Sequence, residues 1–270
     1  MYLFLKYIKL IFTFFIMLIF ANNIYALTYY DSQIVHQPKD GVIKVYGAGG
    51  PHHLFKKIAE NYSKKTGKKV EIQFGPEATW STKAQADADI IWGTSEQSMT
   101  GFLKNYKSFN SKDVVPIYIR PAIIAVKKGN PKKIKSIDDL LKKNIKIIVT
   151  EGGGISNTSG SGLWEDIVGR TGSLNDIINF RKNIISFQPN SGSSFKSFQE
   201  NDADAWITWP NWVSEKSNFL EAIEIDENRR IWRDLNIVIS PEADNNSMEF
   251  VEYLISPESM KIMGQDGWVR

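Results

Sequence analysis

Short apolar segments alternate with amphipathic segments along almost the whole chain, and loops rich in Gly, Ser and Thr lie between them. The β-branched run at 42–46 is followed by the glycine-rich residues 47–50 and by a helical pattern that begins at Pro51. The apolar runs at 70–74 and 90–92 are followed by similar loops and helical patterns. Strands that alternate with helices in this way predict an α/β fold whose sheets are mostly parallel.

A second series of the same kind begins after Arg120 and Pro121. Its predicted strands are 122–126, 145–149, 184–187 and 203–209, and its predicted helices are 136–143, a segment starting at Leu163, and 195–200. Ligands of open α/β sheets lie beyond the carboxyl ends of the strands, so these recurring loops predict one shared crevice if two such sheets face each other. The alternative is that Gly and Ser serve only as turn and cap residues.

The longest of these loops, TEGGGISNTSGSGLWED at 150–166, joins a predicted strand to a predicted helix. The free N–H groups and the dipole at a helix N-terminus favour negative charge, and glycines let the backbone approach a ligand closely. The loop therefore predicts an anion site, with a flexible surface loop as the alternative.

Two catalytic motifs do not fit this loop. A P-loop ends in Gly-Lys followed by Ser or Thr, whereas Ser161 follows Gly160 and the loop contains no lysine. A nucleophile elbow needs glycines two residues before and after the serine, which neither Ser159 nor Ser161 has. ATP hydrolysis and serine hydrolysis are therefore not expected.

The N-terminal residues 1–26 have the pattern of an export signal. Lys6 and Lys9 precede an apolar run at 10–20, and Ala26 is a suitable residue at which to cleave. The alternative, a membrane anchor, needs a run of roughly 20 apolar residues, which is longer than this one. The chain has no cysteine, which excludes disulfides, thiolate metal sites and lipid attachment at a lipobox. We expect a free periplasmic protein.

The formal net charge is only +3 at pH 7, from 33 basic and 30 acidic residues. The short lysine pairs are scattered between acidic segments, which is typical of solvated surfaces. This balance argues against a nucleic-acid partner.

Five segments resemble periplasmic solute-binding proteins of the molybdate and sulfate type, and more closely the accessory colonisation factor AcfC group. They are GPEATW at 75–80, KAQADADIIWGTSEQSM at 83–99, PIYIRPAIIAVKKGNP at 116–131, the loop at 150–166, and DADAWITWPNW at 202–212. The resemblance implies a type II periplasmic-binding-protein fold, in which two α/β lobes, each a mixed, mostly parallel sheet flanked by helices, close on a ligand. It also implies delivery to the permease of an ABC-type importer.

On this reading residues 27–119 form lobe 1, which is completed by about 211–270, and residues 120–210 form lobe 2. We expect a monomer that binds a small anion, such as sulfate or molybdate, between the lobes. One alternative is an acidic amino acid or organic acid as ligand. Another is a colonisation or host-interaction factor with the same fold and no transport role, and a third is an exported esterase, which the three histidines and absent cysteine disfavour.

The resemblance also assigns ligand-binding residues. In lobe 1 they are Gly49 or Gly50 (with Ala48 as a further option), Thr79 or Ser81, Thr94 and Ser95, and in lobe 2 Asn157, Thr158, Ser159, Gly160, Ser193 and Trp209. Trp209 replaces the tyrosine of the molybdate-binding pattern, and an indole donates a hydrogen bond but cannot accept one. The pattern therefore does not by itself identify molybdate as the ligand.

Arg120 is the strongly charged residue nearest the proposed passage between the lobes. Its planar guanidinium either forms two parallel hydrogen bonds to a carboxylate or sulfate of the ligand, or forms a salt bridge that stabilises the hinge. We expect no cofactor and no metal, because His52 and His53 are adjacent and do not share a helix face, and His36 is the remaining histidine.

Overall fold

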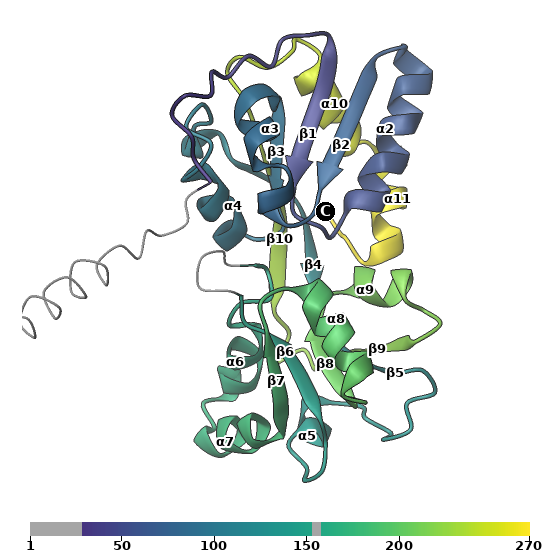
Figure 1. Cartoon of the computed structure of the whole chain (residues 1–270). Helices are drawn as coiled ribbons and strands as arrows, with labels where there is room; N and C mark the ends of the chain where they lie inside the picture. Colours follow the sequence, from purple (N-terminus) through teal and green to yellow (C-terminus); the bar gives the residue numbers. More distant parts are fainter. Residues whose placement is uncertain (1–28, 153–157) are drawn as a thin grey trace, which may run out of the picture.

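The computed structural model describes residues 29–152 and 158–270. The expected signal segment 1–26 and the candidate residue Asn157 lie outside the described residues. Within them the chain forms two five-stranded sheets, which Figure 1 shows in two lobes, one above the other. The predicted α/β architecture of two mixed, mostly parallel sheets flanked by helices is confirmed.

The first sheet has the strand order β2-β1-β3-β10-β4. Its strands are β1 (Val42–Gly47), β2 (Lys69–Phe74), β3 (Ile90–Gly93), β4 (Val115–Pro121) and β10 (Trp232–Ile239). β1 is parallel to β2 and β3, and β10 is antiparallel to both of its neighbours. The glycine-rich ends of β1, β2 and β3 consequently meet at one edge of the sheet.

The second sheet repeats this plan with the order β7-β6-β8-β5-β9. Its strands are β5 (Ile123–Lys127), β6 (Ile147–Thr150), β7 (Ile184–Gln188), β8 (Ala205–Thr208) and β9 (Leu220–Glu224). β6 is parallel to β7 and β8, and β5 is antiparallel to β8 and β9.

Helices cover both faces of each sheet because successive strand residues point to opposite sides. On β1, Ile43 and Val45 pack with α2 (His52–Thr66), α10 (Ser247–Leu254) and α11 (Pro257–Met263), whereas Tyr46 packs with α3 (Ser81–Asp87) and α4 (Glu96–Leu103). The short 3-10 turns η1 (Glu77–Thr79), η2 (Ser111–Asp113) and η4 (Gly264–Asp266) complete this lobe.

The second sheet is covered in the same way. On β5, Ile124 and Val126 pack with α5 (Ile137–Leu140), α6 (Leu163–Val168) and α7 (Leu174–Asn183), while Ile123 and Ala125 pack with α8 (Ser191–Glu200) and α9 (Pro210–Glu215). The 3-10 turn η3 (Gly169–Thr171) links α6 to the segment before α7. Trp206 is fully buried in this core.

The chain passes between the sheets twice. One residue, Ala122, separates β4 of the first sheet from β5 of the second, and residues 225–231 lead from β9 back to β10. Because β9 pairs with β5, the chain returns to the first sheet later than the expected position near residue 211. The helix expected at 136–143 is shorter than predicted, since α5 ends at Leu140 and Asn144 has a positive φ of 66°. No helix in residues 29–152 or 158–270 has both the length and the apolar character of a membrane span.

Candidate ligand-binding site

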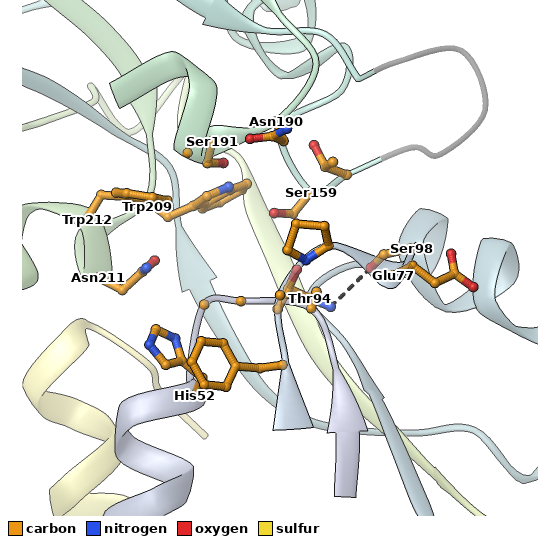
Figure 2. A pocket seen from close by; sticks show the side chains of 18 of the residues that line it. His52, Glu77, Thr94, Ser98, Ser159, Asn190, Ser191, Trp209, Asn211 and Trp212 are labelled. Atoms are coloured by element: carbon orange, nitrogen blue, oxygen red, sulfur yellow. Dashed lines mark hydrogen bonds between the residues drawn. The ribbon is translucent and has the colours of Figure 1, made fainter. Parts of the chain in front are cut away.

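A cavity of about 400 Å³ lies where the loops of the two lobes meet. Its first-lobe wall contains Ala48, Gly49, Gly50, His52, Phe74, Gly75, Pro76, Glu77, Ala78, Thr94, Ser98, Phe102 and Arg120, besides Tyr29, and its second-lobe wall contains Thr158, Ser159, Pro189, Asn190, Ser191, Gly192, Trp209, Asn211, Trp212 and Glu215. Figure 2 shows Thr94 and His52 on the side opposite Trp209 and Ser191. The crevice predicted from the loops is therefore present between two facing lobes.

Arg120, near the end of β4, is the cation of this cavity and is only 1% exposed. Its guanidinium carbon lies 4.6 Å from the ring centroid of Trp209 and 4.3 Å from that of Trp268. Nη1 donates to Asn211 Oδ1 at 2.6 Å and Nη2 to Ser159 Oγ at 3.4 Å, so both acceptors are neutral and belong to the second lobe. Burial lowers the pKa of Arg120 to about 9, which leaves the side chain cationic at neutral pH.

The loop after β1 approaches this cation closely. Gly50 has a φ of +76°, and a Cβ there would lie 3.0 Å from Thr94 Cγ2 and 3.5 Å from Arg120 Nη1. A side chain would thus be strained and would occupy space beside the guanidinium. Gly49 also lines the cavity, but a Cβ on it would meet nothing within 4 Å.

The long loop of the second lobe contributes Thr158 and Ser159 to the cavity wall. Thr158 Oγ1 accepts from Gly160 N at 3.2 Å, which turns the loop back toward α6. Gly160 itself packs against Thr150, where a Cβ would lie 2.9 Å from that residue's Cβ. Gly160 therefore allows close packing of the loop rather than forming part of the wall.

The remaining expected site residues do not line the cavity. Thr79 donates its hydroxyl to Pro76 O, and Ser81 is buried on α3. Ser95 is the N-cap of α4, where its Oγ accepts from Ser98 N, and Ser193 lies in the first turn of α8. Ser98, which lies three residues after Ser95 in the first turn of α4, lines the cavity and accepts from the backbone N–H groups of Thr94 and Ser95.

The N-terminus of α8 also faces the cavity, through Asn190, Ser191 and Gly192. Asn190 caps this ten-residue helix by accepting from Ser193 N at 2.9 Å. The dipole and free N–H groups of the first turn favour an anion at this place. The Asn-x-x-Ser spacing predicts the cap, but only the fold shows that Asn190 and Ser191, rather than Ser193, reach the cavity.

A carboxylate-imidazole cluster that sequence reasoning missed forms another part of the wall. His52 and Glu215 line the cavity, and His53 lies beside them with Nδ1 3.4 Å from Glu215 Oε1 and Nε2 3.0 Å from Asp266 Oδ2. These two carboxylates raise the pKa of His53 to about 9, whereas burial lowers the pKa of His52. The cluster joins α2 and η4 of the first lobe to α9 of the second.

Glu77, in the first-lobe wall, has hydrogen-bond partners of its own. Its Oε1 accepts from Asn105 Nδ2 at 2.8 Å and from the Tyr106 hydroxyl at 3.0 Å. Burial raises the pKa of this carboxyl group, and the two hydrogen bonds oppose that rise. The cavity thus combines one buried cation and a helix N-terminus with carboxylates that already have partners.

Solved structures of the protein PEB3 resemble the chain over most of its length. PEB3 bound to L-phospholactate is 45% identical to this chain, and the match covers 84% of this chain and 99% of that chain with a TM-score of 0.81. PEB3 from Campylobacter jejuni is 44% identical, covers the same shares of both chains and has a TM-score of 0.80.

Two more distant structures share the fold. The sulfate-binding protein SubI from Mycobacterium tuberculosis H37Rv is 15% identical over 85% of this chain and 86% of that chain, with a TM-score of 0.67. The periplasmic molybdate-binding protein of Azotobacter vinelandii is 15% identical over 84% and 99%, with a TM-score of 0.63. These matches confirm the predicted type II binding-protein fold.

No curated protein sequence gives a significant match to the chain. A family model for bacterial extracellular solute-binding proteins matches residues 43–269, which include both sheets and every described wall residue except Tyr29. The protein therefore belongs to the bacterial extracellular solute-binding proteins.

Proposed function

We propose that this protein captures a small organic acid that carries a phosphate or a second carboxylate, and that Arg120 holds its charge. The observation that carries the proposal is the state of Arg120, a fully buried guanidinium in the cavity wall whose two hydrogen-bond acceptors are neutral. No carboxylate of the described residues lies within salt-bridge distance of it. The buried carboxylate of Asp266 acts on Arg120 only from beyond contact distance, and a buried cation without a carboxylate in direct contact favours a bound anion.

The cavity favours an anion with more than one charged group. Its volume of about 400 Å³ falls in the range of sites for organic molecules, roughly 300–1,000 Å³. Arg120 and the N-terminus of α8 are separate positions for negative charge, and Thr94, Thr158 and Ser159 supply hydroxyl groups near them. L-phospholactate, which PEB3 binds, has a phosphate and a carboxylate on a three-carbon skeleton, and we take it as the first ligand to test.

A single tetrahedral oxyanion is the second candidate. The hydroxyl groups and the glycine backbone at Gly49 and Gly50 are neutral donors, which suit a fully ionised sulfate or molybdate. A small ion needs a cavity that closes tightly around it. The large indole of Trp209 and the fixed guanidinium of Arg120 occupy the space that such closure would need, so they favour the larger organic acid.

We further propose that residues 1–26 direct export to the periplasm, and that the monomeric protein presents its ligand to the permease of an ABC importer. Lobe 1 comprises the residues of the first sheet and its helices, and lobe 2 lies between Ala122 and residue 231. A role in colonisation without transport is the alternative, and a membrane permease encoded beside the gene would favour import.

Calorimetric titration with L-phospholactate, sulfate and molybdate tests the ligand class. We expect L-phospholactate to bind with a Kd in the micromolar range, about −8 kcal/mol, and more tightly than the two inorganic ions. Arg120→Lys should weaken this binding at least tenfold, because an ammonium group cannot reproduce the planar fork.

Arg230→Lys is the matched control, since Arg230 pairs with Glu224 outside the cavity. If Arg120→Lys retained full affinity but melted at a lower temperature, Arg120 would be a hinge residue and the proposal would be wrong. Tighter binding of sulfate or molybdate than of L-phospholactate would favour the second candidate.

A further inference from the structure

His52, His53 and Glu215 bring three metal-binding groups together at one end of the cavity. One nitrogen or oxygen atom of each residue lies within 4.8 Å of the corresponding atoms of the other two. The two histidines begin α2 in the first lobe, and Glu215 ends α9 in the second. Their adjacency in sequence therefore does not prevent a shared site, because the third group arrives from another part of the fold.

Two imidazole nitrogens in this cluster are buried without a hydrogen-bond partner. They are Nδ1 of His52 and Nδ1 of His53; neither makes a hydrogen bond to a described residue, and Nδ1 of His53 lies 3.4 Å from Glu215 Oε1. A buried polar atom without a partner is costly, and such atoms are rare in folded proteins. One nitrogen of each ring lies within 4.8 Å of a Glu215 carboxylate oxygen, so a single bound cation would satisfy all three groups.

The two rings are held in place from outside the cluster. Asp266 is 3% exposed, and its Oδ2 lies 3.0 Å from His53 Nε2 while its Oδ1 accepts from the Ser214 hydroxyl at 2.6 Å. The ring of His52 stacks on Phe74 with the centroids 3.9 Å apart. A carboxylate on the far nitrogen of a histidine is the usual support of a metal-bound imidazole, because it fixes the ring and its tautomer.

We propose that His52, His53 and Glu215 bind a divalent transition-metal ion of the zinc, nickel or copper class, with Asp266 orienting His53. Two imidazoles and one carboxylate form a ligand set typical of these ions, whereas calcium and magnesium prefer oxygen ligands alone. A divalent ion that takes the place of the proton between His53 and its two carboxylates raises the charge of the cluster by one.

The position of this site links it to the cavity and to both lobes. His52 and Glu215 line the cavity, so a bound ion adds positive charge to the compartment that also contains Arg120. Since its ligands come from α2 and α9, the ion also connects the two lobes directly. The site differs from the anion site proposed above, and its test uses the metal alone.

The experiment is a titration of the untagged protein with zinc chloride at neutral pH, in the absence of any organic acid, followed by calorimetry and by the rise in melting temperature. We expect one ion per chain. His52→Ala, His53→Ala and Glu215→Gln should each weaken zinc binding about tenfold or more, and Asp266→Asn should weaken it by about tenfold through the orientation of His53.

His36→Gln is the matched control, because His36 is the chain's other histidine and bonds to Gln85 O and Ser240 Oγ away from the cavity. It should bind zinc as the parent does. Folding of each variant is checked by circular dichroism, and the absorption spectrum of bound cobalt(II) reports directly whether nitrogen ligands are present. Absence of zinc binding, or equal binding by His36→Gln, His53→Ala and Glu215→Gln, would overturn the proposal whether or not L-phospholactate binds.

Discussion

The guanidinium of Arg120 is stacked against the indole of Trp268, with 4.3 Å between its central carbon and the ring centroid. Trp209 lies on the guanidinium as well, at 4.6 Å, but Trp209 lines the cavity and Trp268 does not. Trp268, at the C-terminal end of the first lobe, therefore supports the cation from behind. This arrangement separates the residues that face a ligand from those that hold Arg120 in position.

Replacement of Trp268 should weaken ligand binding without removing a wall residue. Trp268→Leu removes one face of the stack, so we expect the affinity for L-phospholactate to fall by about 1–2 kcal/mol, roughly five- to thirtyfold. Trp268→Phe keeps an aromatic face and should retain most of the affinity. Calorimetry on both variants checks this, with melting temperatures to follow folding. Equal affinities of the Leu variant and the parent protein would show that the stack does not position Arg120.

A carboxylate at position 211 should compete with the ligand for Arg120. Asn211 Oδ1 accepts from Arg120 Nη1 at 2.6 Å, so Asn211→Asp provides the buried cation with a permanent counter-ion. We expect anion affinity to fall about a hundredfold, close to 3 kcal/mol, while the melting temperature is kept or raised, because charge-assisted pairs are stronger than neutral hydrogen bonds.

Asn211→Ala serves as the comparison for this change, since it removes the acceptor without adding charge. It should reduce binding less than Asn211→Asp does. If the two variants bound L-phospholactate equally well, neutralisation of Arg120 would not control the affinity.

Gly50 and Gly49 offer a matched pair of alanine substitutions. Gly50→Ala places a methyl group 3.0 Å from Thr94 Cγ2 at a positive φ, so we expect a loss of stability of about 1 kcal/mol or more and weaker anion binding. Gly49→Ala meets no atom within 4 Å and should change both quantities little. Denaturant unfolding and calorimetry of the pair measure the effects, and a similar loss in both variants would contradict the close approach at Gly50.

The second lobe contains a pH-dependent ion pair between Arg229 and Asp176, 2.5 Å apart. The hydrogen bond from Arg229 lowers the pKa of Asp176, and burial opposes it. Because the folded pKa lies below the unfolded value of about 3.9, the stabilisation is complete above that pH and is lost as the pH falls through the folded pKa.

Asp176→Asn should therefore destabilise the protein by about 1–3 kcal/mol at pH 7. The difference from the parent should shrink below about pH 4, where the Asp176 carboxyl group first becomes protonated in the unfolded chain, and should disappear below the folded pKa. Urea unfolding at pH 7 and at pH 3 measures both values. A difference of the same size at the two pH values would exclude this ion pair as its source.

The sequence predicted the parts of the site that depend on local pattern. Loops at the carboxyl ends of parallel strands meet at one edge, which predicted the crevice, and the family resemblance assigned Gly50, Thr94 and Ser159 to it. Ser95 lies in the right loop, but its Oγ caps α4, as the spacing of Ser95 and Ser98 indicates. A cap and a ligand donor require the same residue types, which is why the pattern could not separate them.

The contacts that depend on how the two lobes meet could not be predicted. His53 and Glu215 belong to helices that cover different sheets, and no periodicity in either segment indicates that they touch. The stack of Trp268 on Arg120 likewise joins the C-terminal segment to β4. The end of lobe 2 was placed too early because β9, which has alternating half-exposed residues, was not recognised as a strand of the second sheet.

The single residue between β4 and β5 has a mechanical consequence. Arg120 is separated from the second sheet only by Pro121 and Ala122, and proline fixes its own φ near −65°. On the proposed function, a ligand that binds Arg120 would therefore act on the chain within two residues of one of the two crossovers between the sheets. We expect occupancy of the cavity to be coupled to the relative position of the two lobes through this short connection.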